Sequence, residues 1–231
     1  MSQIRGNSVK PMLRIRVPCF DNSDIIRSLN KTLIGRITNP ETQNVGSIVS
    51  VMPKIWKLDD GRVTGSDLGL GRFRLDFKRE EDILEVLKTE SFSFNQWMVS
   101  IVRWEPAVYK NHPCDITFWV SLVGVPRHWW EDRVLRRIGD ELGTVREVDE
   151  VNAMVKVTVN GTKPLCFEIP VRFETSGEEV DVKVEYEKLS GYCSTCFRLS
   201  HDKESCPESD LRKEVEEEKD LKMHATICMN D

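Results

Sequence analysis

The sequence lacks any apolar run long enough to cross a lipid bilayer, and its first residues lack the apolar core of a secretion signal. We therefore expect an intracellular protein with no membrane partner. Positive charge is not in excess either, because 33 Lys and Arg against 38 Asp and Glu give a formal net charge of −5. Such a chain does not coat nucleic acid by bulk electrostatic attraction, so any contact with phosphate has to come from local groups of cations.

Signatures of catalysis are also missing. The four glycines between residues 61 and 71 are not followed by the Lys-Ser or Lys-Thr pair that a phosphate-binding P-loop needs. His112 and Cys114 lie two positions apart, but the sequence around Pro113 offers no partner that would orient them as a nucleophile and its base. We predict that the chain is not an enzyme and has no catalytic residues and no small-molecule substrate.

Histidine is scarce, yet it occurs together with cysteine near the end of the chain. Three of the seven cysteines and one of the four histidines fall within fourteen positions, in the pattern C-x2-C-x4-H-x4-C. Three thiolates and one imidazole complete a tetrahedral zinc shell and leave no open position for water or substrate. The sequence therefore predicts one structural zinc ion (Zn2+), bound by Cys193, Cys196, His201 and Cys206.

A segment as short as residues 191–207 cannot bury a core of its own. Zinc binding to such peptides is worth about 10–16 kcal/mol near pH 7, and this is also their folding free energy. We therefore expect loss of the metal to disorder roughly residues 192–206 and to leave the rest of the chain folded.

Residues 27–108 show the order β-α-β-β-α-β, which predicts an α+β domain with the ferredoxin-like arrangement of RNA-recognition motifs (RRM-like). The expected strands include Thr32–Ile37, Arg72–Phe77 and residues 97–104. One helix is expected to open at Asn39-Pro40 and to end or kink at Pro53. The second is expected to start at Glu80, where negative charge suits the helix dipole.

The alternation in Arg72–Phe77 predicts which residues of this strand are buried. It assigns Phe73 to the core with the other apolar residues and leaves Arg72 and Arg74 on the open face. RNA-recognition motifs present aromatic rings on that face for base stacking. Without them, this sheet either contacts phosphate or is a scaffold with no role in nucleic-acid binding.

Residues 109–190 predict a second, strand-rich α+β unit. Strands are expected at 118–125, 144–149, 153–160, 165–174 and 180–186. A helix with an apolar stripe around Leu135 should end at Gly143 as its C-cap, and Asn160-Gly161 is typical of a hairpin turn. Because the last strand runs almost directly into residues 191–207, we expect the metal module to dock on this sheet.

The two ends of the chain differ in charge. Residues 1–36 hold seven Lys or Arg against two acidic residues, whereas 208–231 hold eight acidic residues against four basic ones. We interpret 1–26 as a flexible basic arm. Residues 208–231 form an acidic tail, which is either a solvated segment or a competitor for the basic face of a binding module.

The cysteine and histidine pattern resembles the CCHC zinc knuckle of retroviral nucleocapsid proteins and other single-strand nucleic-acid binders. It departs from the common form at Phe197 and Ser200, where that knuckle often has glycine. Further motifs occur in a familiar order: Ile34-Gly35, Gly71-Arg72-Phe73, Gly124-Val125-Pro126 and Val184-Glu185-Tyr186-Glu187.

Together, over about residues 28–206, these motifs look like a plant family with an RRM-like domain of unknown function followed by a zinc knuckle. Its members resemble the nucleic-acid-binding parts of LINE-type retrotransposon proteins. The resemblance implies nucleic-acid binding and residence in the nucleus.

Two functions remain open from the sequence. In the first, the chain binds single-stranded RNA or DNA, with aromatic contacts worth about 1–3 kcal/mol per stacked base. The candidate base contacts are Tyr192, Phe197 and Leu199, and the candidate phosphate contacts are Arg198, Lys203, Arg72 and Arg74. In the second, the chain is a protein-interaction module in which zinc is purely structural. Tyr192 and Phe197 would then pack onto the preceding sheet.

Overall fold

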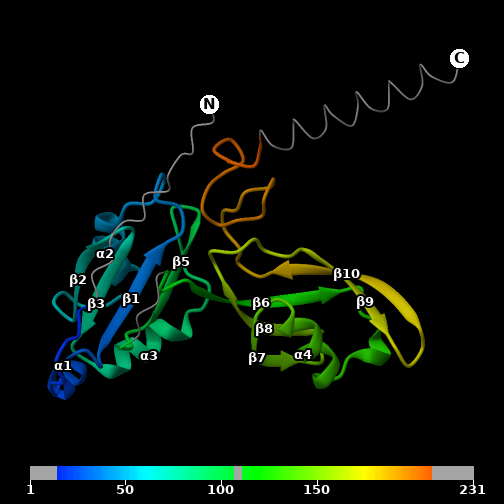
Figure 1. Ribbon diagram of the computed structural model, residues 1–231, viewed down its shortest axis with the longest axis horizontal. Helices are drawn as coiled ribbons and strands as arrows, with labels where there is room; N and C mark the ends of the chain where they lie inside the picture. Colours follow the sequence, from blue (N-terminus) through cyan, green and yellow to red (C-terminus); the bar gives the residue numbers. More distant parts are fainter. Residues whose placement is uncertain (1–14, 107–110, 210–231) are drawn as a thin grey trace, which may run out of the picture.

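The structure, a computed structural model, describes residues 15–106 and 111–209. It contains two five-stranded sheets, and every strand pair in them is antiparallel (Figure 1). Within these residues, no helix has the length and apolar character to span a membrane. The expected basic arm lies largely outside this part of the chain, as does nearly all of the acidic tail. A short helix, α1 (Ser23–Ser28), precedes the first sheet.

The first domain has the predicted ferredoxin-like order of elements. Its elements are β1 (Thr32–Ile37), α2 (Val45–Ile55), β2 (Val63–Gly69), β3 (Arg72–Phe77), α3 (Glu80–Lys88), β4 (Ser93–Phe94) and β5 (Trp97–Arg103). The strands lie in the order β2-β3-β1-β5-β4, so β3, β1 and β5 are the inner strands. The short strand β4 is an addition at the edge that the sequence did not predict.

The predicted start of the first long helix is wrong. Helix α2 begins at Val45, and its N-cap is Asn44, whose side chain accepts a hydrogen bond of 3.0 Å from the Ser47 backbone nitrogen. Residues 38–43 stay a loop because the buried amide of Gln43 accepts from the Asn39 backbone nitrogen and donates to the Trp97 carbonyl. Pro53 does not end the helix, which continues to Ile55.

The first domain's core lies on one face of the sheet, as the alternation predicted. Phe73 and Leu75 are fully buried, while Arg72 and Arg74 are partly exposed on the other face. Gly35 is required on β1, because a Cβ atom there would lie 2.0 Å from the Phe73 ring. The glycine lets this ring pack directly against the neighbouring strand.

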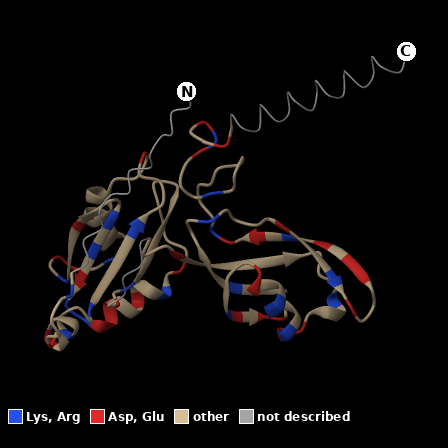
Figure 2. Cartoon of the chain, viewed as in Figure 1, with Lys and Arg blue, Asp and Glu red and all other residues tan. Residues whose placement is uncertain are grey.

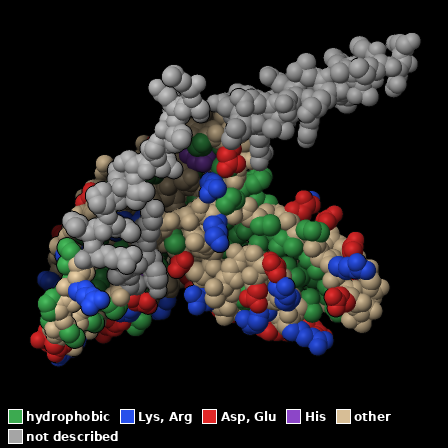
Figure 3. Space-filling view, in the orientation of Figure 1, with side chains coloured by type: hydrophobic (Ala, Val, Ile, Leu, Met, Phe, Trp, Pro, Cys, Tyr) green, Lys and Arg blue, Asp and Glu red, His purple; other side chains and the backbone are tan. Residues whose placement is uncertain are grey.

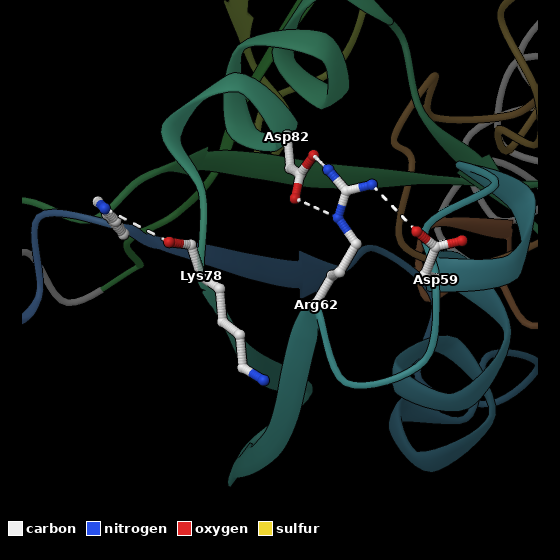
Figure 4. Close-up of polar contacts among 5 residues, drawn as sticks. Asp59, Arg62, Lys78 and Asp82 are labelled. Carbon is white, nitrogen blue, oxygen red and sulfur yellow. Dashed lines mark hydrogen bonds and ion pairs between the residues drawn. The ribbon is translucent and has the colours of Figure 1, made fainter.

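A buried ion pair ties the start of β2 to the first turn of α3 (Figure 4). Asp82 is only 5% exposed, and Arg62 holds both of its oxygens, with Nε donating to Oδ2 over 3.1 Å. The same guanidinium also reaches Asp59, over 3.3 Å. Removing one partner of such a pair costs about 3–5 kcal/mol, because the other charge is left buried.

The second domain repeats the strand order of the first. Its elements are β6 (Asp115–Val123), the 3-10 helix η1 (Arg127–Trp129), α4 (Asp132–Asp140), β7 (Thr144–Asp149), β8 (Met154–Asn160), β9 (Glu168–Phe173) and β10 (Glu178–Tyr186). The order β7-β8-β6-β10-β9 matches β2-β3-β1-β5-β4 position by position. The first domain forms α3 and β4 between β3 and β5. The second domain forms only β9 between the corresponding strands, β8 and β10.

Two predicted turns in the second domain are wrong. Asn160-Gly161 is not a hairpin turn, since β8 pairs with β6 and β9 pairs with β10, so the chain crosses over after β8. Gly161 instead lies close to Cys114, to whose carbonyl its nitrogen donates over 2.7 Å. The C-cap of α4 is Glu141, not Gly143. Glycine at 143 is explained by the Thr158 carbonyl, which a Cβ atom would approach to 2.3 Å.

Candidate metal centre

The four predicted metal ligands come together in the structure. Their ligand atoms lie within 4.8 Å of one another, and Cys196 Sγ is 3.3 Å from His201 Nε2. Zinc bonds of about 2.0–2.3 Å in a tetrahedron place ligand atoms about 3.3–3.8 Å apart. All three cysteines are buried and His201 is half-buried. This donor set forms a closed site for one structural zinc ion.

The histidine ring has a partner on its far side. Ser200 Oγ lies 2.9 Å from His201 Nδ1, on the side of the ring away from the cysteines. A hydrogen bond at this position fixes the tautomer of a metal-binding imidazole and orients Nε2 toward the metal. Ser200, one of the two departures from the common knuckle, thus supports the ligand geometry.

The chain turns tightly around the site through a left-handed residue. Phe197 has a φ of +60°, the conformation for which the common knuckle uses glycine. Its nitrogen donates to the Cys193 carbonyl over 2.8 Å, and the Cys193 nitrogen donates to the Arg198 carbonyl over 2.8 Å. The knuckle turn is therefore kept, at a strain of about 1–2 kcal/mol for a non-glycine residue.

The thiols differ in how readily they lose a proton. Burial raises the pKa of Cys193, but hydrogen bonds from the backbone N–H groups of Cys196 and Thr195 and from the Cys206 and Cys196 side chains together lower that pKa to about 7. Burial raises the pKa of Cys196 to about 11, and the Cys193 sulfur adds to the effect. Because zinc binds thiolates, binding has to displace the Cys196 proton, and zinc affinity should fall as the pH falls.

The metal segment (residues 191–207) docks on the second domain, as expected. Leu199 is 0% exposed and belongs to the same apolar core as Phe118. The Leu165 nitrogen donates to the Phe197 carbonyl over 2.8 Å, and Arg198 Nη1 donates to the Thr162 carbonyl over 3.0 Å. The segment therefore completes the core of this domain.

The metal segment also contacts the first domain. Gly191 lies against the β4–β5 turn, where a Cβ atom would come within 2.5 Å of the Gln96 carbonyl oxygen. The Ser190 nitrogen lies 3.3 Å from the sulfur of Met98, a first-domain residue that is fully buried in the core of the second. The two domains and the metal segment therefore share one packed region.

Two of the predicted base-contacting residues are accessible. Tyr192 is 40% exposed and Phe197 is 38% exposed. A third ring, which the sequence did not single out, is that of Phe167, whose centroid lies 5.0 Å from that of Tyr192 and 5.5 Å from that of Phe197. Phe167 precedes β9, and only the folding of this crossover brings it to the metal segment. Hydrophobic side chains are visible on the second domain next to the metal segment (Figure 3).

One predicted base contact is wrong. Leu199 points into the core of the second domain, so it cannot wedge between bases. Among the predicted phosphate contacts, Lys203 is exposed, whereas Arg198 is bound to Thr162 and lies 3.7 Å from Glu208. Arg72 and Arg74 lie on β3 of the first domain, not on the metal segment (Figure 1).

Comparison with protein families finds two matches. Residues 25–109 match the model of a domain of unknown function, DUF4283, and residues 159–208 match a zinc knuckle model. The chain thus carries a DUF4283 domain followed by a zinc knuckle. The second match begins before β9, so it includes the β9–β10 hairpin as well as the metal ligands.

A curated relative is the uncharacterized protein At4g02000 of Arabidopsis thaliana, 30% identical over 134 residues. The match covers 54% of this chain and 42% of the relative, so the chain spans less than half of that protein's length.

Two solved structures overlap with the chain, each across 69% of it. One is the Sxl-lethal protein/RNA complex, at 15% identity, 84% coverage of that chain and a TM-score of 0.29. The other is the RNA binding domain of Hrp1 in complex with RNA, at 12% identity, 98% coverage and a TM-score of 0.30. At TM-scores below 0.5, neither overlap bears on what this chain binds.

Proposed function

We propose that the chain binds single-stranded RNA or DNA through the metal segment, without catalysing a reaction. The observation that carries this proposal is the exposure of Tyr192 and Phe197 beside a turn fixed by a closed metal site. Aromatic rings next to cations bind unpaired bases by stacking, worth about 1–3 kcal/mol per base. Lys203 is exposed on the same segment and would contact phosphate.

The absence of catalysis is part of the proposal. A site with four protein ligands leaves no position where zinc would activate water. Burial, followed by the charge of Asp115, raises the pKa of the Cys114 thiol, which makes it a poor nucleophile at neutral pH. Descent from a LINE-type retrotransposon and residence in the nucleus are proposed from the motif resemblance alone. Microscopy of the tagged chain in cells tests whether it resides in the nucleus.

A protein-interaction module with purely structural zinc is the second candidate. It is favoured by the packing of Tyr192 and Phe197 against Phe167, which uses part of each ring, and by the net charge of −5. In this case the metal segment completes the second domain and has no ligand of its own.

Fluorescence anisotropy separates the two candidates. Zinc-loaded protein is titrated with labelled single-stranded RNA, single-stranded DNA and duplex at two salt concentrations. Binding to nucleic acid should prefer single strands and weaken with salt, because phosphate contacts release counterions. Tyr192→Ala should weaken binding roughly tenfold, whereas the matched control Phe20→Ala, at an exposed aromatic outside both domains, should not. No binding at either salt concentration supports the second candidate.

A further inference from the structure

Two arginines face each other on the open side of the first sheet. Arg36 of β1 and Arg72 of β3 are direct partners in the antiparallel register. Basic residues lie side by side on these two strands (Figure 2). Like charges directly opposite each other destabilise a sheet, so an unbalanced pair at its centre calls for an explanation.

Neighbouring acids do not balance this pair. The nearby Asp76 is committed, because one oxygen lies 2.9 Å from Arg74 Nε and the other accepts from Thr32 Oγ1 over 2.7 Å. Within residues 15–106 and 111–209, neither Arg36 nor Arg72 has an ion pair with an acidic residue. Cys114 lies close to Arg36, but burial raises its thiol pKa, so it supplies no negative charge at neutral pH.

Both side chains also hold donors without an acceptor. The Nε atoms of Arg36, Arg72 and Arg74 are buried and make no hydrogen bond in the described part of the chain, but only that of Arg74 has a carboxylate at ion-pair distance. Arg36 Nη2 donates to the His112 carbonyl over 3.2 Å, which fixes one end of its guanidinium. Buried donors of this kind are almost always satisfied in folded proteins, by protein, water or an ion.

We propose that Arg36 and Arg72 form a subsite for an oxyanion of the phosphate type. Guanidinium groups bind phosphate through paired N–H donors, and one anion between them would neutralise their repulsion and satisfy both buried donors. If the phosphate belongs to a nucleic-acid backbone, the subsite rests on the proposed function. It also changes which residues of the first sheet are expected to contact phosphate. Arg36, which the sequence did not single out, takes the role first assigned to Arg74, whose charge is used by Asp76.

The test uses the full zinc-loaded chain and resonances of the arginine Nε–H groups in NMR. Inorganic phosphate is added first, and a single-stranded oligonucleotide is added to a separate sample. Phosphate should shift the Arg36 and Arg72 signals and leave that of Arg133, on α4, unchanged. Arg36→Gln and Arg72→Gln should each lower phosphate affinity at least tenfold, while Arg74→Gln should lower it less than threefold.

The oligonucleotide separates the two sources of phosphate. If the backbone occupies the subsite, Arg36→Gln should reduce the salt slope of binding by about one unit, as expected for one lost phosphate contact. Melting in phosphate-free buffer controls for folding, because removing one of two repelling cations should not lower Tm.

Each outcome has one meaning. A phosphate response without oligonucleotide binding supports the subsite and contradicts the proposed function. Oligonucleotide binding that is unchanged in Arg36→Gln, together with no response to phosphate, overturns the subsite and leaves the proposed function standing. No response to either ligand overturns both.

Discussion

The two domains share a strand order but complete their cores in different ways. The first covers its sheet with α2 and α3, which bury Ile48 and Ile83. In the described residues of the second domain, α4 is the one α-helix, and the core includes Leu199 from the metal segment. A strand order therefore does not determine what covers the sheet, and a small metal-bound module contributes apolar surface where the first domain uses a helix.

This difference changes what each domain depends on. The first is held by its own side chains, including the buried Arg62–Asp82 pair. The second includes Leu199 from a segment whose order we expect to come from zinc. We therefore expect the two domains to respond to different perturbations, and the following predictions test that expectation in order of decreasing effect.

Removing zinc should disrupt the second domain and spare most of the first. Structural zinc contributes about 10–16 kcal/mol to the folding of zinc-finger peptides. In this chain Leu199 and Leu165 link the metal segment to the core of the second domain. NMR of methyl groups during titration with a chelator should show loss of the Val120 and Val157 signals while Leu33 persists. If signals disappear only from residues 192–206, the second sheet is stable without the segment, as the sequence alone had led us to expect.

Breaking the buried ion pair should destabilise the first domain and spare the second. Asp82→Ala should destabilise the first domain by about 3–5 kcal/mol, because Arg62 is left partly buried without its partner. Urea unfolding followed by first-domain NMR signals measures the loss. Asp59→Ala removes only the exposed partner of the same arginine and should cost less than about 1 kcal/mol. Equal losses in the two variants would show that burial of Asp82 is not what matters.

Leu199→Ala should destabilise the second domain by about 2–5 kcal/mol while zinc stays bound, because the change leaves a cavity but keeps all four ligands. Urea unfolding and zinc content are measured on the same samples. Leu70→Ala, at an exposed position of the first domain, is the control and should change stability by less than about 0.5 kcal/mol. A loss of zinc in Leu199→Ala would mean that packing forms the metal site, and not the reverse.

Relieving the left-handed conformation at Phe197 should have the smallest effect on stability. Phe197→Gly and Phe197→Ala both remove the ring contact with Phe167, but only glycine also relieves the positive φ. The glycine variant should therefore be more stable than the alanine variant by about 1 kcal/mol in thermal unfolding. At Asn95 in the first domain, which also has a positive φ, the same pair of changes should differ in the same direction. A more stable alanine variant at 197 would show that the turn is not strained.

The sequence by itself determined the features that rest on local spacing. The ligand set follows from four positions within fourteen residues, and β3 follows from strict alternation, which also placed Arg72 outward and Phe73 inward. Local patterns succeed here because a metal shell and a half-buried strand impose fixed periods on neighbouring residues.

Only the tertiary structure decided the features that join distant segments. Asn160-Gly161 has the chemistry of a hairpin turn, but the pairing of β8 with β6 and of β10 with β9 makes it a crossover. A leucine at position 199 is compatible with contact to a base or with burial in a core, and the sequence around it does not distinguish the two. Arg36 and Arg72 are 36 residues apart in the sequence, and only the register between β1 and β3 places them opposite each other. Such pairings are set by the free energy of packing whole sheets, which no short window of sequence contains.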